Sequence, residues 1–313
     1  MPPDSVTPGD LQQTEPTTCV LAFNASDPCG AGGQAADIMA TACVGAHALT
    51  VMTGAYARDT SHIFDFYPLD DEAVAEQARA VLEDTEVQAI KLGFAGTPDN
   101  LGVVAGISAD YPDIPLIAFM PDLSWWSTDE IDSYHEAFVD LILPQTAVLI
   151  GNYSTLRRWL LPLWPHDHRP PGARDLAIAA GELGASYTLV SGIDLGERGI
   201  DNILASPQSL LASARFDRLD GQFIGAGDTL SATFTALLAN GYTLTDAFTE
   251  ALDFLDGSLK GGFRPGMGHT LPDRLFWAQP ATKPDDTTDT PASSNPDSCD
   301  IFSKHIHSHD TQH

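Results

Sequence analysis

The chain of 313 residues carries a formal net charge of −28, from 43 acidic and 15 basic residues. A surface of this sign repels nucleic acid and anionic membranes, so neither is expected as a partner. There is no apolar run of the ~18 residues needed to cross a bilayer and no secretion signal, so a cytoplasmic location is expected. The acidic excess with few lysines also fits a host with high internal salt, which screens the charge.

The two ends of the chain differ in composition from its middle. Residues 1–18 are rich in Pro, Thr and Gln, and residues 281–313 combine Pro, Asp, Ser and Thr with a histidine cluster, so both are expected to be disordered. Residues 19–280 remain as one domain. The four cysteines form no CxxC pair, so neither a disulfide framework nor a zinc site is expected.

Short apolar runs alternate with helical patterns between these ends. The predicted strands are residues 20–25, 48–53, 89–94, 115–119, 147–150 and 187–190. The predicted helices are residues 71–82, 128–141, 174–183, 229–239 and 244–259. Such alternation indicates an α/β fold with a doubly wound, mostly parallel sheet and helices on both faces. Ligands of such sheets bind beyond the carboxyl ends of the strands.

The most informative motif is a Gly-Ala-Gly turn at residues 225–227, followed directly by Asp228 and an apolar, helix-favouring stretch. Glycines allow close approach to a ligand, and the N–H groups at a helix start attract anions. Phosphoryl transfer needs such donors for the migrating phosphate and a base for the accepting hydroxyl. The alternative interpretation is a glycine-rich loop with an acidic helix cap and no further role.

A second glycine-rich loop, at residues 24–37, follows the first predicted strand. Its three glycines let the chain fold over a ligand, and Asp37 falls within the first turns of the next helix. Taken alone, this loop indicates only a turn that needs glycine for its geometry.

Together the two loops resemble the hydroxymethylpyrimidine/phosphomethylpyrimidine kinases of thiamine biosynthesis, which have the ribokinase-like fold. The opening signature A-G-S-D-P-S-G-G-A-G-I-Q-A-D of that family resembles residues 25–37, and its closing G-x-G-H/Q-x-x-P-D-R-x-F-W resembles residues 266–277. Three further blocks, at residues 51–60, 91–94 and 142–152, keep the family order. The resemblance therefore covers the core from about residue 20 to 279.

The resemblance implies an enzyme that uses ATP and Mg²⁺ to phosphorylate hydroxymethylpyrimidine and then its monophosphate. It implies that residue 228, which is usually Cys in this family and Asp in the wider fold, faces the hydroxyl as the base, here Asp228. It also implies that the anion hole consists of Gly225, Ala226 and Gly227. The implied substrate-binding residues are Ala25, Asp37, Arg58 and Phe94, and the implied nucleotide-binding residues are Asn152, Ser191 and Gly192. The metal ligands are not identified, and a homodimer is one open alternative for the oligomeric state.

Several positions depart from the family pattern and leave other functions open. The departures are Arg58 for Gln, Phe94 for Met, Met120 for Asp, Thr155 for an acidic residue, and Ser191-Gly192-Ile193-Asp194 for K-G-G-H. A guanidinium only donates hydrogen bonds, whereas a glutamine amide pairs two-way with an aminopyrimidine. The alternatives are a pyridoxal or sugar kinase of the same fold, or a non-catalytic relative that binds a small ligand.

Overall fold

A single sheet organises the protein, seen in a computed structural model that describes residues 17–165 and 169–278. The described strands form one nine-stranded sheet in the order β3-β2-β1-β4-β5-β6-β7-β8-β9. Their bounds are β1 Cys19–Ser26, β2 His47–Arg58, β3 Ile63–Pro68, β4 Ala89–Leu92, β5 Leu116–Met120, β6 Thr146–Asn152, β7 Tyr187–Asp194, β8 Ile200–Ala205 and β9 Leu210–Phe216. The predicted disordered ends lie outside the described residues, apart from residues 17 and 18, so the domain limits at 19 and 280 stay predictions.

The centre of the sheet is parallel and its two edges are antiparallel. Strands β2, β1, β4, β5, β6 and β7 run parallel, whereas β3 pairs antiparallel with β2, and β8 and β9 continue antiparallel from β7. The predicted fold class is confirmed, together with its six parallel strands. The three antiparallel strands were not predicted: β3 and β9 are edge strands with many exposed positions, and the apolar run of β8 is interrupted by the polar Asp201 and Asn202.

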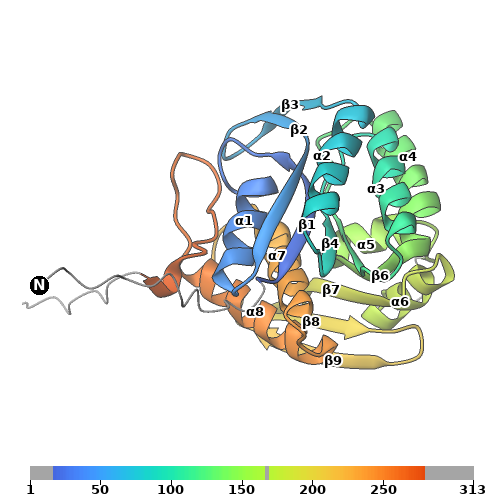
Figure 1. Ribbon diagram of the computed structural model, residues 1–313. Helices are drawn as coiled ribbons and strands as arrows, with labels where there is room; N and C mark the ends of the chain where they lie inside the picture. Colours follow the sequence, from blue (N-terminus) through green and yellow to red (C-terminus); the bar gives the residue numbers. More distant parts are fainter. Residues whose placement is uncertain (1–16, 166–168, 279–313) are drawn as a thin grey trace, which may run out of the picture. The chain divides into compact units, whose positions relative to one another are not determined.

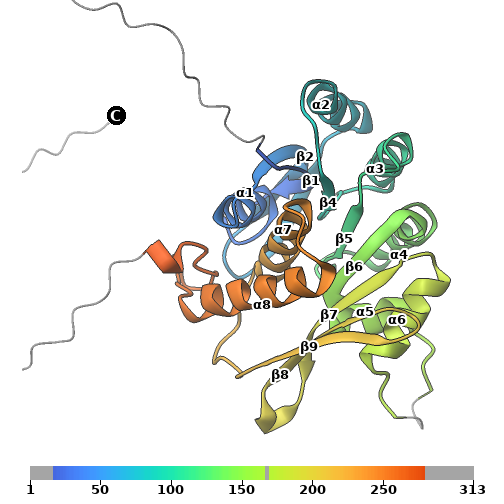
Figure 2. The ribbon, with the colours of Figure 1, turned by 60° about the horizontal axis from the view of Figure 1, so that its bottom comes forward.

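Helices cover both faces of the sheet (Figures 1 and 2). One face carries α1 Gly33–Cys43, α7 Ala226–Ala239 and α8 Leu244–Lys260. The other carries α2 Asp71–Asp84, α3 Pro98–Asp110, α4 Thr128–Ala137, α5 Tyr153–Leu160 and α6 Ala173–Glu182. The predicted helix at 128–141 changes within its length, since α4 ends at Ala137 and a π-helical turn follows over Phe138–Ile142.

Side chains alternate between these two faces along each strand. In β4, Ile90 and Leu92 join the core under α2 and α3, while Ala89 joins the core under α7 and α8. Lys91 therefore points to the α1 and α7 side, although it is fully buried. The structure thus places a cation inside an otherwise apolar strand, under the helices that carry both conspicuous aspartates.

The start of α7 differs from most other helix starts. Side chains cap α2, α3, α4 and α8 through Asp70, Thr97, Ser127 and Thr243. The N-cap of α7 is Gly225, in the left-handed conformation with φ +83° and no side-chain cap. Its first N–H groups therefore remain available at the edge of the sheet, which is the arrangement that binds anions.

The order of the strands also directs attention to this edge. After β1 the chain turns outward to β2 and β3, and it returns on the other side of β1 as β4. The carboxyl ends of β1 and β4 thus flank the point where the order reverses, a common place for ligands in open α/β sheets. In the described part of the chain, no helix is long and apolar enough to span a membrane.

Candidate active site

A small pocket of about 50 Å³, here the central pocket, lies at this reversal point. Its walls come from the ends of β1, β2, β4 and β5 and from the starts of α1 and α7. The lining residues are Asn24, Asp27, Gly32, Gly33, Tyr56, Arg58, Phe94, Phe119, Pro121 and Asp228. Segments that are 204 residues apart in the chain therefore meet around one cavity.

A buried charge cluster supports the inner wall of the central pocket. Lys91 Nζ lies 2.5 Å from Asp37 Oδ1 and 3.2 Å from Asp228 Oδ1. Asn24 Nδ2 donates to the same two carboxylates, at 2.9 Å from Asp37 Oδ2 and 2.9 Å from Asp228 Oδ1. Asp228 is thus held through Oδ1, while its Oδ2 accepts no hydrogen bond from the described residues.

Burial and charge act against each other in this cluster. Burial raises the pKa of Asp37 to about 6, with Lys91 opposing the shift and the Asp228 carboxylate adding to it. Burial alone would lower the pKa of Lys91, but the carboxylates of Asp37 and Asp228 together raise it above its usual value. Lys91 therefore stays a cation that is shared between two carboxylates.

The two glycine-rich loops pack directly against each other. A Cβ on Gly225 would overlap the carbonyl of Ala31, and a Cβ on Gly32 would lie 2.5 Å from Asp228 Oδ2. Arg274 fastens the contact, since its Nε donates to Thr229 Oγ1 at 3.0 Å and its terminal nitrogens donate to the carbonyls of Gly30 and Ala31. Glycine is therefore required at these positions by close approach.

An ion pair lies on the outer wall of the central pocket. Arg58 Nη1 is 3.5 Å from Asp27 Oδ2, and the side chains are 12% and 1% exposed. Asp27 is fixed by further hydrogen bonds from the backbone N–H groups of Cys29 and Gly32, at 3.0 and 2.9 Å. Since the guanidinium is always charged, the outer wall presents a permanent hydrogen-bond donor next to a carboxylate.

Aromatic rings form the remaining side of the central pocket. Tyr56 stacks on Phe94 with ring centroids 5.7 Å apart and an interplanar angle of 15°. Trp125 and Trp126, in the loop after β5, pack edge-on against Phe94 at 6.0 and 5.2 Å. Burial raises the pKa of Tyr56 well above its usual value, so its phenol stays neutral. Such a wall suits the flat face of a heterocycle.

Two further cavities continue from the central pocket toward β7 and β8. The first, of about 270 Å³, reaches the start of α7 and includes Phe119, Asp122, Asn152, Thr155, Ser191, Gly225, Ala226 and Gly227. The second, of about 260 Å³, shares Asn152, Ser191 and Ala226 with it and adds Gly192, Phe216, Arg218, Leu252 and Leu259. Together they make a trough that begins at the uncapped end of α7, with mostly apolar walls that also include Asp122, Asp217, Arg218 and Asp256.

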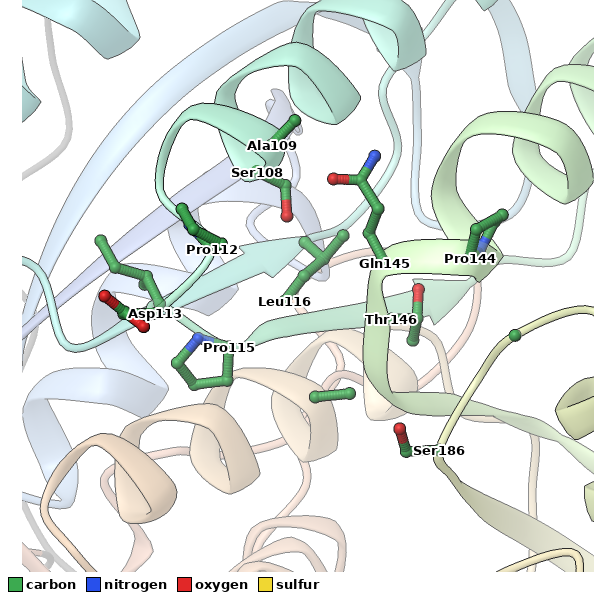
Figure 3. Close-up of a pocket in the computed structure, with 13 residues that line it drawn as sticks. Ser108, Ala109, Pro112, Asp113, Pro115, Leu116, Pro144, Gln145, Thr146 and Ser186 are labelled. Carbon is green, nitrogen blue, oxygen red and sulfur yellow. The ribbon is translucent and has the colours of Figure 1, made fainter.

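A cavity of about 430 Å³ lies instead at the starts of β5 and β6, at the opposite edge of the sheet (Figure 3). Among its lining residues only Asp113 is ionisable, and the others include Ser108, Pro112, Pro144, Gln145 and Ser186. It contains no ion pair, and it lies away from the carboxyl ends of the strands where ligands of such sheets bind. The central pocket is therefore the better candidate despite its smaller volume.

The structure brings together most of the residues that the sequence indicated. Arg58, Phe94 and Asp228 line the central pocket, and the 225–227 turn lies in the adjoining cavity with Asn152 and Ser191. Gly192 lines the far end of the trough.

Two of the predicted substrate-binding residues lie behind the central pocket. Asp37 and Ala25 are fully buried and line neither the central pocket nor the trough. Both oxygens of Asp37 accept hydrogen bonds, from Lys91 and Asn24, so Asp37 supports the pocket from behind.

Sequence reasoning missed Asn24, Asp27, Lys91 and Arg274 as members of the site. Lys91 carried a usable signal, because a lysine in the middle of the apolar run 89–92 is unusual unless its charge is paired. Arg274 lies in the closing block at residues 266–277, but its partners are more than 40 residues away along the chain, so the block did not reveal these contacts.

The fold and the arrangement of the site define a kinase with the ribokinase-like fold. The chain belongs to the phosphomethylpyrimidine kinase family, whose sequence profile matches residues 27–273. The hydroxymethylpyrimidine/phosphomethylpyrimidine kinase of Mycobacterium leprae is 28% identical over 268 residues, which cover 82% of this chain and 94% of the relative. The Streptomyces coelicolor protein of the same description is 27% identical with the same coverage.

Solved structures support the fold. The Bacillus subtilis pyridoxal kinase in its ADP complex aligns with a TM-score of 0.74 at 19% identity, over 84% of this chain and 99% of that protein. The phosphomethylpyrimidine kinase of Clostridium difficile aligns with a TM-score of 0.61 at 20% identity, over 76% and 98% of the two chains.

Proposed function

We propose that this protein transfers the γ-phosphate of ATP to hydroxymethylpyrimidine and then to its monophosphate. The observation that carries the proposal is Asp228, whose Oδ1 is held by Lys91 and Asn24 while Oδ2 is left for a ligand. This carboxylate lies three residues after the uncapped N-cap of α7, in a chain of the phosphomethylpyrimidine kinase family. A base and an anion site therefore adjoin each other.

In the proposed reaction the heterocycle enters the central pocket against Phe94 and Tyr56, with its hydroxymethyl group toward Asp228. Asp228 accepts the hydroxyl proton while the hydroxyl oxygen forms a bond to the γ-phosphorus. The bond from that phosphorus to the β,γ-bridging oxygen breaks, and ADP leaves. The N–H groups of residues 225–227 stabilise the charge on the migrating group, which is the main task in phosphoryl transfer.

The nucleotide is proposed to occupy the trough. Its apolar walls, which include Phe216 and Leu252, suit a purine ring, and its inner end adjoins the anion site. The family's lysine at position 191 is absent, so the α7 start and backbone groups are proposed to hold the phosphates.

The residues at the inner end of the trough also fit Mg²⁺. Mg²⁺ in phosphoryl-transfer sites is usually held by one or two carboxylates together with substrate phosphates and water. Asp122, a carboxylate on the wall of that cavity, would hold it. When bound, Mg²⁺ neutralises charge on the nucleotide phosphates.

A second candidate substrate class is the pyridoxal type. The observation that favours it is Arg58, a donor on the outer wall where an aminopyrimidine would be paired by a two-way amide. A cytoplasmic location without nucleic-acid or membrane partners is proposed from the charge of −28.

An ATP-consumption assay tests the proposal, with hydroxymethylpyrimidine, its monophosphate, pyridoxal and ribose as substrates. It is run with Mg²⁺ and with EDTA, at low and high salt, because the acidic surface responds to screening. Turnover with the pyrimidines above that with pyridoxal is expected. Preference for pyridoxal supports the second candidate, and pyrimidine binding without turnover by any nucleotide supports a non-catalytic relative.

A further inference from the structure

Asp37 and Lys91 form a pair that the proposed reaction does not touch directly. Both side chains are buried, with 0% and 1% exposure, and neither lines the central pocket. Yet Lys91 also contacts Asp228, and the contact to Asp37 is the shorter by 0.7 Å (3.2 against 2.5 Å). The cluster therefore holds one cation between two carboxylates, only one of which reaches the pocket.

How closely Lys91 approaches Asp228, rather than Asp37, decides how readily Asp228 takes a proton. A lysine paired with Asp228 alone would stabilise its anion and weaken it as a base. A second carboxylate adds repulsion and draws the ammonium toward itself. We propose that Asp37 is a positioning residue that holds Lys91 back from Asp228, so that Asp228 stays oriented through Oδ1 and remains basic enough to accept the substrate proton at Oδ2. This inference rests on the proposed function.

Other groups also face Asp228 and remain unchanged in the variants below. Asp27 and Arg58 lie on the pocket side, Arg274 lies behind the start of α7, and Tyr56 borders the pocket. The neutral Asn24 donates to both carboxylates and fixes their spacing. Differences among the variants therefore report on the Asp37–Lys91 pair.

The test is the pH profile of kcat/KM for three variants, Asp37→Asn, Lys91→Met and the double variant. In Asp37→Asn, Lys91 pairs with Asp228 alone and stabilises its anion. The acidic limb of the kcat/KM profile therefore moves to lower pH by about one unit, and the plateau rate falls because Asp228 is a weaker base. Loss of Lys91 moves the limb to higher pH by a similar amount. In the double variant the acidic limb lies between those of the two single variants.

The opposite directions distinguish positioning from a structural role. General loosening of the site would lower the rate in all three variants without moving the limb in opposite senses. Limbs that move the same way in both single variants, or not at all, would overturn the proposal. If Lys91→Met fails to fold, Asp37→Asn and the double variant suffice. The acidic limb of the double variant must then lie at higher pH than that of Asp37→Asn.

Two controls complete the design. Asp201→Asn removes another buried carboxylate, paired with Arg215 at 3.6 Å outside the central pocket, and should leave the limb in place. The titration of the Asp228 carboxyl carbon, followed by NMR and assigned by comparison with Asp228→Asn, needs no substrate. If the wild type is inactive but the Asp228 titration still shifts in the variants as expected, the kinase function is refuted and the proposed role of Asp37 is kept. If the wild type is an active kinase but the Asp228 titration does not shift in the variants, the role of Asp37 is refuted and the kinase function is kept.

Discussion

The central pocket and the trough, which lie at the same edge of the sheet, differ in how many charged side chains contact one another. Around the central pocket, three carboxylates and three cations lie at contact distances or face one another, namely Asp27, Asp37, Asp228, Arg58, Lys91 and Arg274. The trough toward β7 and β8 is lined mainly by apolar side chains and by the backbone at the start of α7, and its charged Asp122, Arg218 and Asp256 pair with partners outside it. Fixed charges need individual partners, whereas apolar walls and N–H groups tolerate many sequences. Single substitutions are therefore expected to have larger effects around the central pocket than in the trough.

The largest expected effect comes from the carboxylate that borders both regions. Asp228→Asn keeps the shape of the side chain but removes the group that accepts the proton, so kcat should fall by ~10²–10⁴-fold. Nucleotide affinity, measured by calorimetry, should stay within about twofold because the trough is unchanged. Full activity in Asp228→Asn would show that the anion site and metal carry catalysis without a base.

Gly225 joins the two regions, and its replacement should destabilise the fold. A Cβ there would overlap the carbonyl of Ala31, in addition to the strain of φ +83°. The matched control is Gly241→Ala, where φ is +86° but nothing lies within 4 Å of the added atom. Urea unfolding should show a loss of about 1–2 kcal/mol for the control and ~3 kcal/mol or more for Gly225→Ala. Equal losses would mean that the loops do not press together here.

Arg58→Gln tests whether charge on the outer wall sets the substrate. Glutamine restores donation and acceptance from one side chain, so kcat/KM for hydroxymethylpyrimidine should rise about tenfold relative to that for pyridoxal, the equivalent of one good hydrogen-bonding match. The exposed Arg79→Gln on α2 should leave this ratio unchanged. A ratio that stays constant in Arg58→Gln as well would remove Arg58 from substrate choice.

The smallest effect is expected in the trough. Leu255 lines both of its cavities, and Leu255→Ala should raise the KM for ATP about three- to tenfold through lost apolar contact, with little change in kcat. Leu210→Ala, 56% exposed on β9, serves as the control. A fall in kcat with unchanged KM would contradict a wall that only binds the nucleotide.

Part of the site was accessible from the chain alone. The order of the glycine-rich loops along the chain predicted the family. The placement of Asp228 at an anion-binding helix start was also predicted, because it depends on local backbone chemistry. The parallel strands followed from continuous apolar runs such as residues 147–150. The edge strands β3 and β9 were not predicted because most of their residues are exposed or half-buried, so they lack a continuous apolar run.

What the sequence determined by itself is therefore the class of fold, the turn at residues 225–227 and the presence of Asp228 at a helix start. Only the tertiary structure decided that Asp37 is buried behind the pocket, that Lys91 is shared by two carboxylates, and that Arg58 meets Asp27. The physical reason is distance along the chain. Local patterns encode strands, helices and turns, whereas an ion pair between residues 137 positions apart exists only once the sheet has brought their elements together.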